Sequence, residues 1–147
     1  MKKLLVSACL LGVACRYDGK SKPVKDVIAL GEEYSIIPVC PEILGGLPTP
    51  RIPCEIRDGR VISRNGEDKT AEYVKGAEEV LRLARLLDCN TAVLKKKSPS
   101  CGIGEIYDGS FTGKTAKGDG VCAALLKANE IRVLNETEIN ELQDGEL

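Results

Sequence analysis

The stretch KLLVSAC, residues 3–9, indicates which fold to expect, because a short apolar run of strand length ends directly in Cys9. Three further runs of the same kind follow it, and they are Ile36–Val39, Thr91–Leu94 and Ile131–Leu134. Helical patterns separate these runs, over Val24–Glu33, Lys69–Leu87 and Gly120–Asn129. Strands that alternate with helices predict a parallel sheet that is covered on both faces.

The expected fold class is therefore α/β, with one Rossmann-like parallel sheet flanked by helices in a single domain over residues 1–147. A β-hairpin insertion is expected at Glu55–Ser63, where an Asp-Gly pair lies between two short extended runs. The segment Asn135–Leu147 contains five acidic residues and no basic residue. We expect that segment to be solvated or frayed.

Composition limits the classes of partner. Charged residues make up 29% of the chain and balance to a formal net charge of −1, so no overall field favours nucleic acid or an anionic membrane. The apolar segment that begins at Leu4 is too short to span a bilayer, and no A-x-A cleavage pattern follows it. A cytoplasmic protein without a membrane partner is expected. The sequence gives no direct evidence of nucleic-acid binding, and it leaves the oligomeric state open.

The chain contains seven cysteines and no histidine. Seven is an odd number, so the cysteines cannot all pair in internal disulfides. In a cytosolic protein, this cysteine content indicates metal or redox chemistry more often than structural disulfides. The lack of histidine excludes Cys-His dyads, mixed Cys/His zinc sites and histidine bases. Any site must use thiolates, carboxylates, hydroxyls, lysines or arginines.

Cys9, Cys40 and Cys101 follow predicted strands. In an open parallel sheet, the loops at the carboxyl ends of the strands meet along one edge, and ligands bind where the strand order reverses. Thiolates gathered there would raise each other's pKa, so a cation or cluster would stabilise them. Structural zinc usually requires four ligands in C-x-x-C pairs, which are absent, whereas an iron-sulfur cluster can accept three thiolates and leave one iron open. Free cysteine is also a common buried residue, so a structural role stays open.

The other cysteines are expected to be structural, with one exception. Cys89 ends an apolar helical pattern and Cys122 lies on an apolar helical stripe, so both are expected to be buried. Cys54 has no visible partner in the sequence and is assigned the same role. Cys15 has C-x5-C spacing from Cys9, which leaves it either an auxiliary thiol or a turn residue.

Five motifs run in one order from the first strand to the last helix. They are VSACLLGVACRYDG (6–19), VCPEILGGLPTPRIPCEI (39–56), GEDKTAEYVKGA (66–77), LKKKSPSCG (94–102) and IYDGSFTGK (106–114). Together they resemble the full-length pattern of the TudS-like thiouracil desulfidase family. Cys54 departs from that pattern, because a small residue that binds no metal is expected at its position.

The resemblance implies a 4Fe-4S cluster with one open iron, held by the same three cysteines, Cys9, Cys40 and Cys101. It implies catalytic roles for Glu42 in the CPE motif and for Ser98 in the SPSC motif. The motif contains a second serine, Ser100, and it leaves open which of the two serines is catalytic. The predicted substrate contacts are Ser100, Arg16 and Lys96. The lysine run around Lys96 would steer an anionic substrate or form a solvated face.

The predicted function is the iron-sulfur-dependent, non-redox desulfuration of a thiolated pyrimidine, a 2-thiouracil or 4-thiouridine type of compound, with release of hydrogen sulfide. An open iron suits a sulfur atom of the substrate, and Glu42 would act as general base toward water. The expected partner is a small thiolated base or nucleotide. Two alternatives stay open, namely an iron-sulfur or zinc binding and sensing module without turnover, and a sulfur transferase that carries a persulfide on Cys101.

Overall fold

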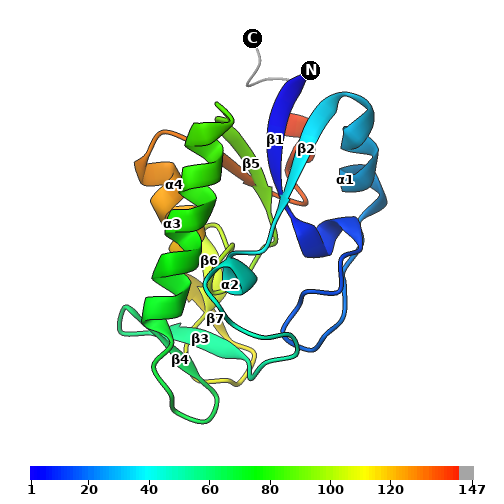
Figure 1. Ribbon diagram of the computed structural model, residues 1–147. Helices are drawn as coiled ribbons and strands as arrows, with labels where there is room; N and C mark the ends of the chain where they lie inside the picture. Colours follow the sequence, from blue (N-terminus) through cyan, green and yellow to red (C-terminus); the bar gives the residue numbers. More distant parts are fainter. Residues whose placement is uncertain (143–147) are drawn as a thin grey trace.

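The computed structural model describes residues 1–142 and shows a parallel sheet of four strands (Figure 1). The strands are β1 (Lys2–Ser7), β2 (Tyr34–Val39), β5 (Thr91–Leu94) and β8 (Arg132–Asn135). Their order across the sheet is β2-β1-β5-β8, and every pair is parallel. The chain passes from β1 to β2 on one side and returns to β5 on the other, so the strand order reverses at β1. The predicted parallel sheet is confirmed.

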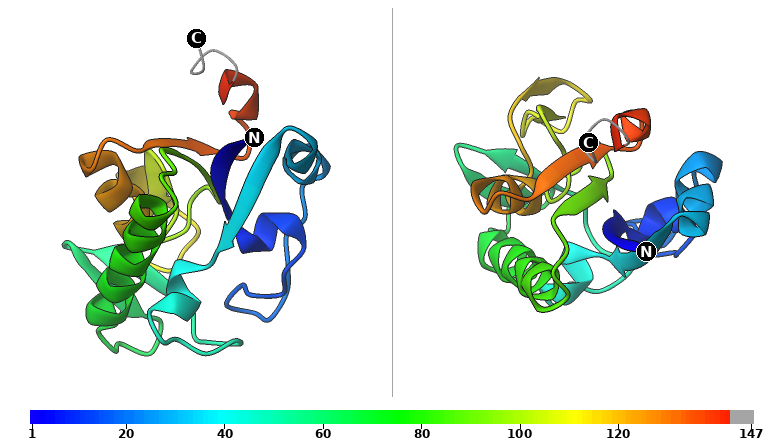
Figure 2. Two further views of the ribbon diagram at one scale, coloured as in Figure 1. Left: turned by 45° about the horizontal axis from the view of Figure 1, so that its top comes forward. Right: turned by 90° about the horizontal axis from the view of Figure 1, so that it is seen from above.

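Helices cover both faces of this sheet (Figure 2). On one face lie α3 (Thr70–Leu86) and α4 (Val121–Ala128), which pack against each other. On the other face lies α1 (Lys25–Ala29), continued by a 3-10 turn over Leu30–Glu32. The predicted helices therefore exist, with small differences at their ends. None of the helices within residues 1–142 is long and apolar enough to cross a membrane.

The central strand β1 is buried from both sides. Leu4, Leu5 and Val6 are fully buried, and successive side chains of a strand point to opposite faces of the sheet. Leu5 belongs to the core cluster that contains Val80 of α3, whereas Leu4 and Val6 belong to the cluster that contains Val27 of α1. Burying one such side chain stabilises the fold by about 1.5–3 kcal/mol. The continuous apolar run at residues 4–6 is therefore explained by two cores that share one strand.

Two antiparallel hairpins lie beyond the carboxyl ends of the sheet strands (Figure 1). The predicted hairpin consists of β3 (Cys54–Arg57) and β4 (Arg60–Ser63), and its turn residues Asp58 and Gly59 both have positive φ, 53° and 75°. Asp-Gly pairs favour such a turn. The second hairpin, β6 (Glu105–Tyr107) with β7 (Thr115–Lys117), is not predicted from the sequence. Its strands have only three residues each, which is too few to produce a periodic pattern.

Two short helical turns follow β1 and β2, and the apolar pattern does not predict either of them. They are a 3-10 helix over Ala8–Leu11 and the helix α2 (Pro41–Leu44). Each has four residues, which is little more than one turn, and Pro41 is well suited to the first position of α2. The first turn contains Cys9, and Cys40 is the N-cap residue of α2.

The C-terminal segment is more ordered than its acidic composition predicts. Asn135 is the last residue of β8, and Ile139–Leu142 form a 3-10 helix. Leu142 is buried in the core cluster on the α1 side of the sheet. The prediction of a frayed segment is therefore wrong for 135–142, because apolar side chains anchor it, and residues 143–147 lie outside the described residues.

The helices α2 and α3 touch through their backbones. Gly45 directly follows α2, and a Cβ atom built on it would lie 2.0 Å from the backbone oxygen of Glu72. A Cβ atom on Gly76 of α3 would lie 1.9 Å from the backbone oxygen of Pro41. Only glycine fits at either position, and this contact fixes α2 and its neighbour Cys40 against the long helix.

We expect Gly76→Ala to destabilise the protein by about 2 kcal/mol, because the added methyl group would overlap the Pro41 carbonyl. Replacing glycine by alanine inside a helix normally stabilises a protein by about 0.5–1 kcal/mol. A loss of stability in Gly76→Ala would therefore indicate the overlap with the Pro41 carbonyl. Urea denaturation measures the free energy of unfolding. The control is Gly31→Ala, whose Cβ would make an ordinary contact of 3.5 Å with Ile36 Cδ1. Equal stabilities of the two variants would contradict the close approach.

Candidate active site

A cavity of about 350 Å³ lies beyond the carboxyl ends of the sheet strands. Its wall is formed by the segments that follow β1, β2 and β5, together with residues of both hairpins. Because the strand order reverses at β1, the cavity occupies the position at which open α/β sheets bind their ligands. A cavity of this size fits a small organic molecule.

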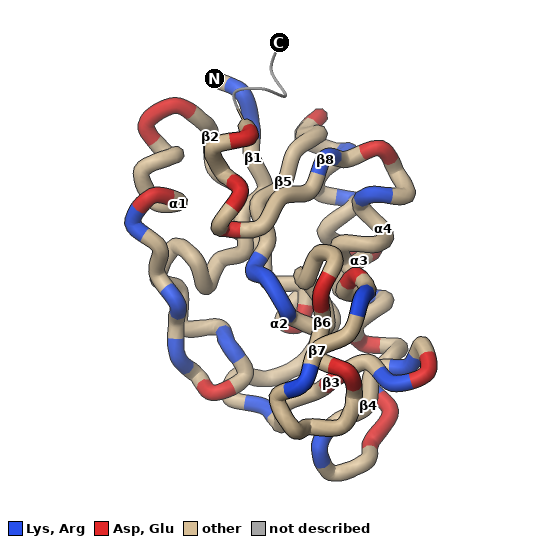
Figure 3. Tube along the Cα trace, turned by 180° about the vertical axis from the view of Figure 1, so that it is seen from behind, with Lys and Arg blue, Asp and Glu red and all other residues tan. Residues whose placement is uncertain are grey.

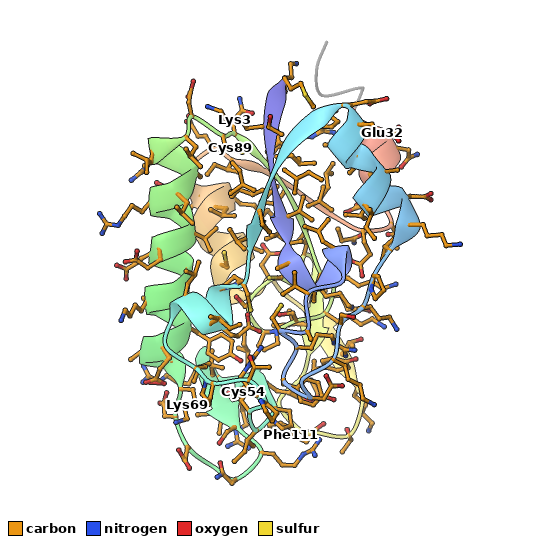
Figure 4. All side chains as sticks on the ribbon, turned by 45° about the vertical axis from the view of Figure 1, so that its right-hand side comes forward. Lys3, Glu32, Cys54, Lys69, Cys89 and Phe111 are labelled. Atoms are coloured by element: carbon orange, nitrogen blue, oxygen red, sulfur yellow. The ribbon has the colours of Figure 1, made fainter. Side chains whose placement is uncertain are left out.

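The structure brings most of the predicted site residues into this one cavity. The predicted residues that line it are Cys9, Cys40, Cys101, Glu42, Ser98, Arg16 and Lys96. Cys15 and Cys54 also line it, although the sequence left Cys15 open and assigned Cys54 a structural role. Cys89 and Cys122 are buried in the core as predicted, and Figure 4 shows Cys89 at the end of the molecule opposite to Cys54.

Three thiols form one corner of the site. The Cys15 thiol lies in hydrogen-bonding contact with those of Cys9 and Cys40, and the Cys40 thiol donates to the Cys15 carbonyl oxygen at 3.8 Å. The contact with Cys15 raises the pKa of Cys40, and so does burial. The Cys40 contact lowers the pKa of Cys15, but the Cys9 thiol and burial outweigh it and raise that pKa to about 11. Thiolates at this corner therefore require a compensating positive charge.

Cys101 is attached to the end of the central strand through Ser7. The Ser7 hydroxyl donates to Cys101 Sγ at 3.4 Å and accepts a hydrogen bond from the backbone N–H of Lys95 at 2.9 Å. Burial raises the pKa of Cys101 well above its usual range, and the charge of Glu42 adds to this effect. One buried serine thus connects β1, the loop after β5 and the third candidate ligand.

The turn SPSC presents Ser98 to the cavity. Ser98 Oγ accepts hydrogen bonds from the backbone N–H groups of Ser100 and Cys101, each at 3.0 Å. The Ser98 carbonyl oxygen accepts a further bond from Gly102 N–H at 2.9 Å. Among residues 1–142, Ser98 Oγ is found only as an acceptor, so its hydrogen is available for donation toward the cavity, which Ser98 lines.

Ser100 lies behind the cavity wall. It is fully buried and is absent from the residues that line the cavity. Its hydroxyl makes no hydrogen bond of good geometry within residues 1–142, but it lies close enough to lower the pKa of Glu42. The first residues of α4 cover it, since the N–H groups of Cys122 and Ala123 donate to the Ser100 carbonyl oxygen. Its position therefore favours contact with Glu42 over the predicted contact with substrate.

Glu42 and Arg51 form a buried ion pair. Arg51 Nη2 lies 3.6 Å from Glu42 Oε2, and the two side chains are only 6% and 13% exposed. Burial raises the pKa of Glu42, whereas the Arg51 guanidinium lowers it. Arg51 Nη2 also donates to the Cys15 carbonyl oxygen at 3.1 Å. Arg51 lies in the same long motif as Glu42, but the sequence does not predict that the two side chains pair.

The cavity wall carries more positive than negative charge. Its charged members are Arg16, Arg51, Arg64, Lys95, Lys96 and Lys97 against Glu42 and Glu55. The lysine run is fixed by Glu136, which accepts from Lys96 N–H at 2.8 Å and pairs with Lys95 Nζ at 3.4 Å. Figure 3 shows several basic segments around α2 and the two hairpins. This surface favours an anionic ligand.

The arrangement of the thiols is compatible with an iron-sulfur cluster. Within residues 1–142, no three cysteine or acidic side chains converge on a point as the ligands of one metal ion do. The thiols of Cys9, Cys15, Cys40 and Cys101 instead line one common cavity. Each thiolate ligand of a 4Fe-4S cluster binds a different iron, so these ligands do not need to converge on one point. The sulfur donors present therefore fit an iron-sulfur cluster.

We expect Arg51→Gln to lower the free energy of unfolding by about 3 kcal/mol, because it leaves the buried Glu42 carboxylate without its cation. Urea denaturation at neutral pH measures the loss. Arg60→Gln is the matched control, because Arg60 pairs with Asp68 at the surface, where the side chains are 59% and 42% exposed. That variant should lose less than about 1 kcal/mol. A loss for Arg51→Gln as small as that of the control would contradict its role as counter-ion.

Comparison with known proteins places this site in a family. The family model for 2-thiouracil desulfurase matches residues 4–138. A Bacillus subtilis (strain 168) protein described as uncharacterized protein YbbK is 41% identical over 149 residues, which cover 95% of this chain and 99% of that protein. The solved structure of the 4Fe-4S-dependent thiouracil desulfidase TudS is 44% identical with a TM-score of 0.94, and the match covers 99% of this chain and 97% of that one. The resemblance stated from the motifs is confirmed, and the chain belongs to the 2-thiouracil desulfurase family.

Proposed function

We propose that this protein is a 4Fe-4S-dependent desulfidase that converts a thiolated pyrimidine such as 2-thiouracil into its oxo form. The observation that carries the proposal is that Cys9, Cys40 and Cys101 reach one cavity from the ends of three strands, beside the buried carboxylate of Glu42. The similar solved structure, which is described as a 4Fe-4S-dependent thiouracil desulfidase, supports it.

Cys9, Cys40 and Cys101 are the proposed ligands of the cluster. Each comes from the segment after a different sheet strand, so together they would hold the cluster across the point where the strand order reverses. When bound through three protein ligands, the cluster would supply one iron that is free to act as a Lewis acid toward a sulfur atom.

Glu42 is the proposed general base, which takes a proton from the water that attacks the carbon bearing the sulfur. Burial raises its pKa, which makes the carboxylate a stronger base, and Arg51 favours its charged form. Ser98 is proposed to orient the substrate or that water, because its hydroxyl hydrogen is available. In the overall reaction, the water oxygen replaces sulfur and hydrogen sulfide leaves, so no electrons are gained or lost.

We further propose that the substrate is an anionic thiolated nucleotide in preference to the free base. Arg16 and Lys96 line the cavity together with the other basic residues of its wall. Arginine binds phosphate oxygens in a bidentate manner, and lysine attracts them as a point charge. We also propose a cytoplasmic location, since the cysteines are free and a reducing compartment keeps thiols in that state.

The function is tested with protein reconstituted anaerobically with iron and sulfide. Incubation with 2-thiouracil should release hydrogen sulfide and uracil in equal amounts without any reductant. A thiolated nucleoside and its 5′-monophosphate, compared in the same assay, test the proposed preference for an anionic substrate. If the cluster-loaded protein releases no sulfide from any of these compounds, the proposed function is wrong. Turnover that requires an added two-electron oxidant and leaves a persulfide on Cys101 would favour the sulfur transferase alternative.

In the same assay, Glu42→Gln should keep its iron and sulfide content but lose turnover by about 100-fold or more, because the general base is removed. The control is Glu32→Gln, whose exposed side chain lies on the α1 side of the molecule (Figure 4). That variant should turn over like the unmodified protein. Full activity of Glu42→Gln would remove Glu42 from the mechanism.

Cluster assembly provides a test that does not depend on activity. Cys101→Ala should lose the iron, the sulfide and the brown absorbance of the reconstituted protein, because one of three ligands is missing. Cys122→Ala is the matched control, because Cys122 is also buried in the same core cluster but is not among the residues that line the cavity. It should assemble a normal cluster. Normal iron and sulfide content in Cys101→Ala would exclude Cys101 as a required ligand.

A further inference from the structure

Aromatic side chains are rare in this chain, and most of them surround the cavity. The sequence contains four tyrosines, one phenylalanine and no tryptophan. Tyr17, Tyr73, Tyr107 and Phe111 all line the cavity. Aromatic faces are the surfaces on which planar heterocycles stack, and stacking tolerates different bases because every base has a π-face. The question is which of these rings receives a ligand.

The environments of the rings differ. Tyr73 is only 2% exposed and packs with Cys54 and Val61 in a small core cluster, so it forms the floor of the cavity. Tyr17 is 43% exposed, which places it at the rim. Phe111 is half-buried, lines the cavity and has the Arg64 guanidinium over its ring, 5.6 Å from the centroid. Figure 4 shows Phe111 beside Cys54 at the hairpin end of the molecule.

The loop that carries Phe111 is held by Glu55 of β3. Glu55 Oε1 accepts hydrogen bonds from the backbone N–H groups of Gly109 and Phe111, at 3.0 and 3.1 Å. Phe111 has a positive φ of 57°, which is uncommon for a residue with a side chain and requires support from its surroundings. A Cβ atom on Gly109 would lie 2.7 Å from Arg57 Cβ, so the loop also lies directly against β3.

The burial of Glu55 requires an explanation. Its side chain is 9% exposed, and none of the ion pairs found within residues 1–142 includes it. A buried carboxylate is costly unless it is hydrogen-bonded, and here the two backbone N–H groups of the loop are bonded to it. The residue thus connects the two hairpins at the cavity wall, and what it positions there is Phe111.

We propose that Phe111 is the stacking platform for the pyrimidine ring of the substrate, and that Glu55 is the positioning residue that fixes it in the wall. Arg64 covers one face of the Phe111 ring, and the planar ring of the ligand packs on the other face. This inference rests on the proposed function and deepens it. It assigns the recognition of a flat, unsaturated ring to the hairpins, whereas the cysteines and Glu42 come from the segments that follow the sheet strands.

Binding of compounds that are not turned over tests the platform directly. Equilibrium dialysis compares uracil with 5,6-dihydrouracil, which has the same polar groups but a saturated, non-planar ring. The unmodified cluster-loaded protein should bind uracil about 10-fold tighter than dihydrouracil, since stacking on one aromatic ring is worth about 10-fold or more. Phe111→Leu should abolish this preference and Phe111→Trp should keep it. Leu86→Ala, an exposed position on α3, is the control and should behave like the unmodified protein.

Turnover of 2-thiouracil provides the second readout. Phe111→Leu should raise KM about 10-fold and change kcat by less than about threefold, because the ring contributes to binding and not to the chemistry. A KM within twofold of the unmodified value, together with an unchanged preference for uracil, would overturn the proposal.

Glu55 is tested through the same two readouts. Glu55→Ala should raise KM to the level of Phe111→Leu, and the double variant should be no worse than either single variant, because both changes remove one interaction. Glu55→Gln keeps a carbonyl oxygen that accepts both N–H groups and should restore the KM. If Glu55→Ala lowers only the thermal stability and leaves KM unchanged, Glu55 has no positioning role.

The two proposals fail separately. If the loaded protein releases no sulfide but prefers uracil over dihydrouracil in a Phe111-dependent manner, the proposed function fails and the platform stands. If sulfide is released while the Phe111 variants bind and turn over normally, the function stands and the platform is wrong.

Discussion

Parallel strands end on the same edge of their sheet, and the whole site depends on this constraint. Cys9, Cys40 and Cys101 are far apart in the sequence, but each follows one of three adjacent strands, β1, β2 and β5. The position of β1 between its two neighbours is stabilised by two cores that share its side chains. Any change that displaces β1 would therefore separate the thiols, whatever its effect on the loops that carry them.

Burying the thiols and Glu42 together disfavours their negatively charged forms, so the rest of the cavity must provide positive charge. Burial raises the pKa of both Glu42 and Cys101, and the contact with Cys15 raises that of Cys40. A site that requires thiolates must then receive positive charge from elsewhere. Arg51 supplies part of it as a permanent cation next to Glu42, and the lysine run at the end of β5 supplies more. Because the chain has no histidine, its positive side chains are all lysines and arginines.

The features that the sequence predicts are those with a local pattern. Buried strands appear as apolar runs, α3 appears as a helical period, and the Asp58-Gly59 turn appears as a dipeptide. The cysteine trio follows from strand ends alone, before any family resemblance is used. The Glu42–Arg51 ion pair and the hydrogen bonds of Glu55 were not predicted, because they arise from folded contacts that no local pattern shows. The α2 helix was missed for a similar reason, since its place depends on two glycines that allow backbones to touch.

The proposed reacting groups and the proposed substrate contacts lie on different parts of the fold. The proposed reacting groups lie on segments that the two cores and the α2–α3 contact hold in place. The aromatic and basic residues Phe111 and Arg64 lie on or beside short hairpins that contribute little to those cores. Substitutions there would change the shape and charge of the cavity at a low cost in stability, whereas the cysteines, as proposed cluster ligands, would allow no such freedom. Recognition can therefore change while the proposed cluster site stays the same.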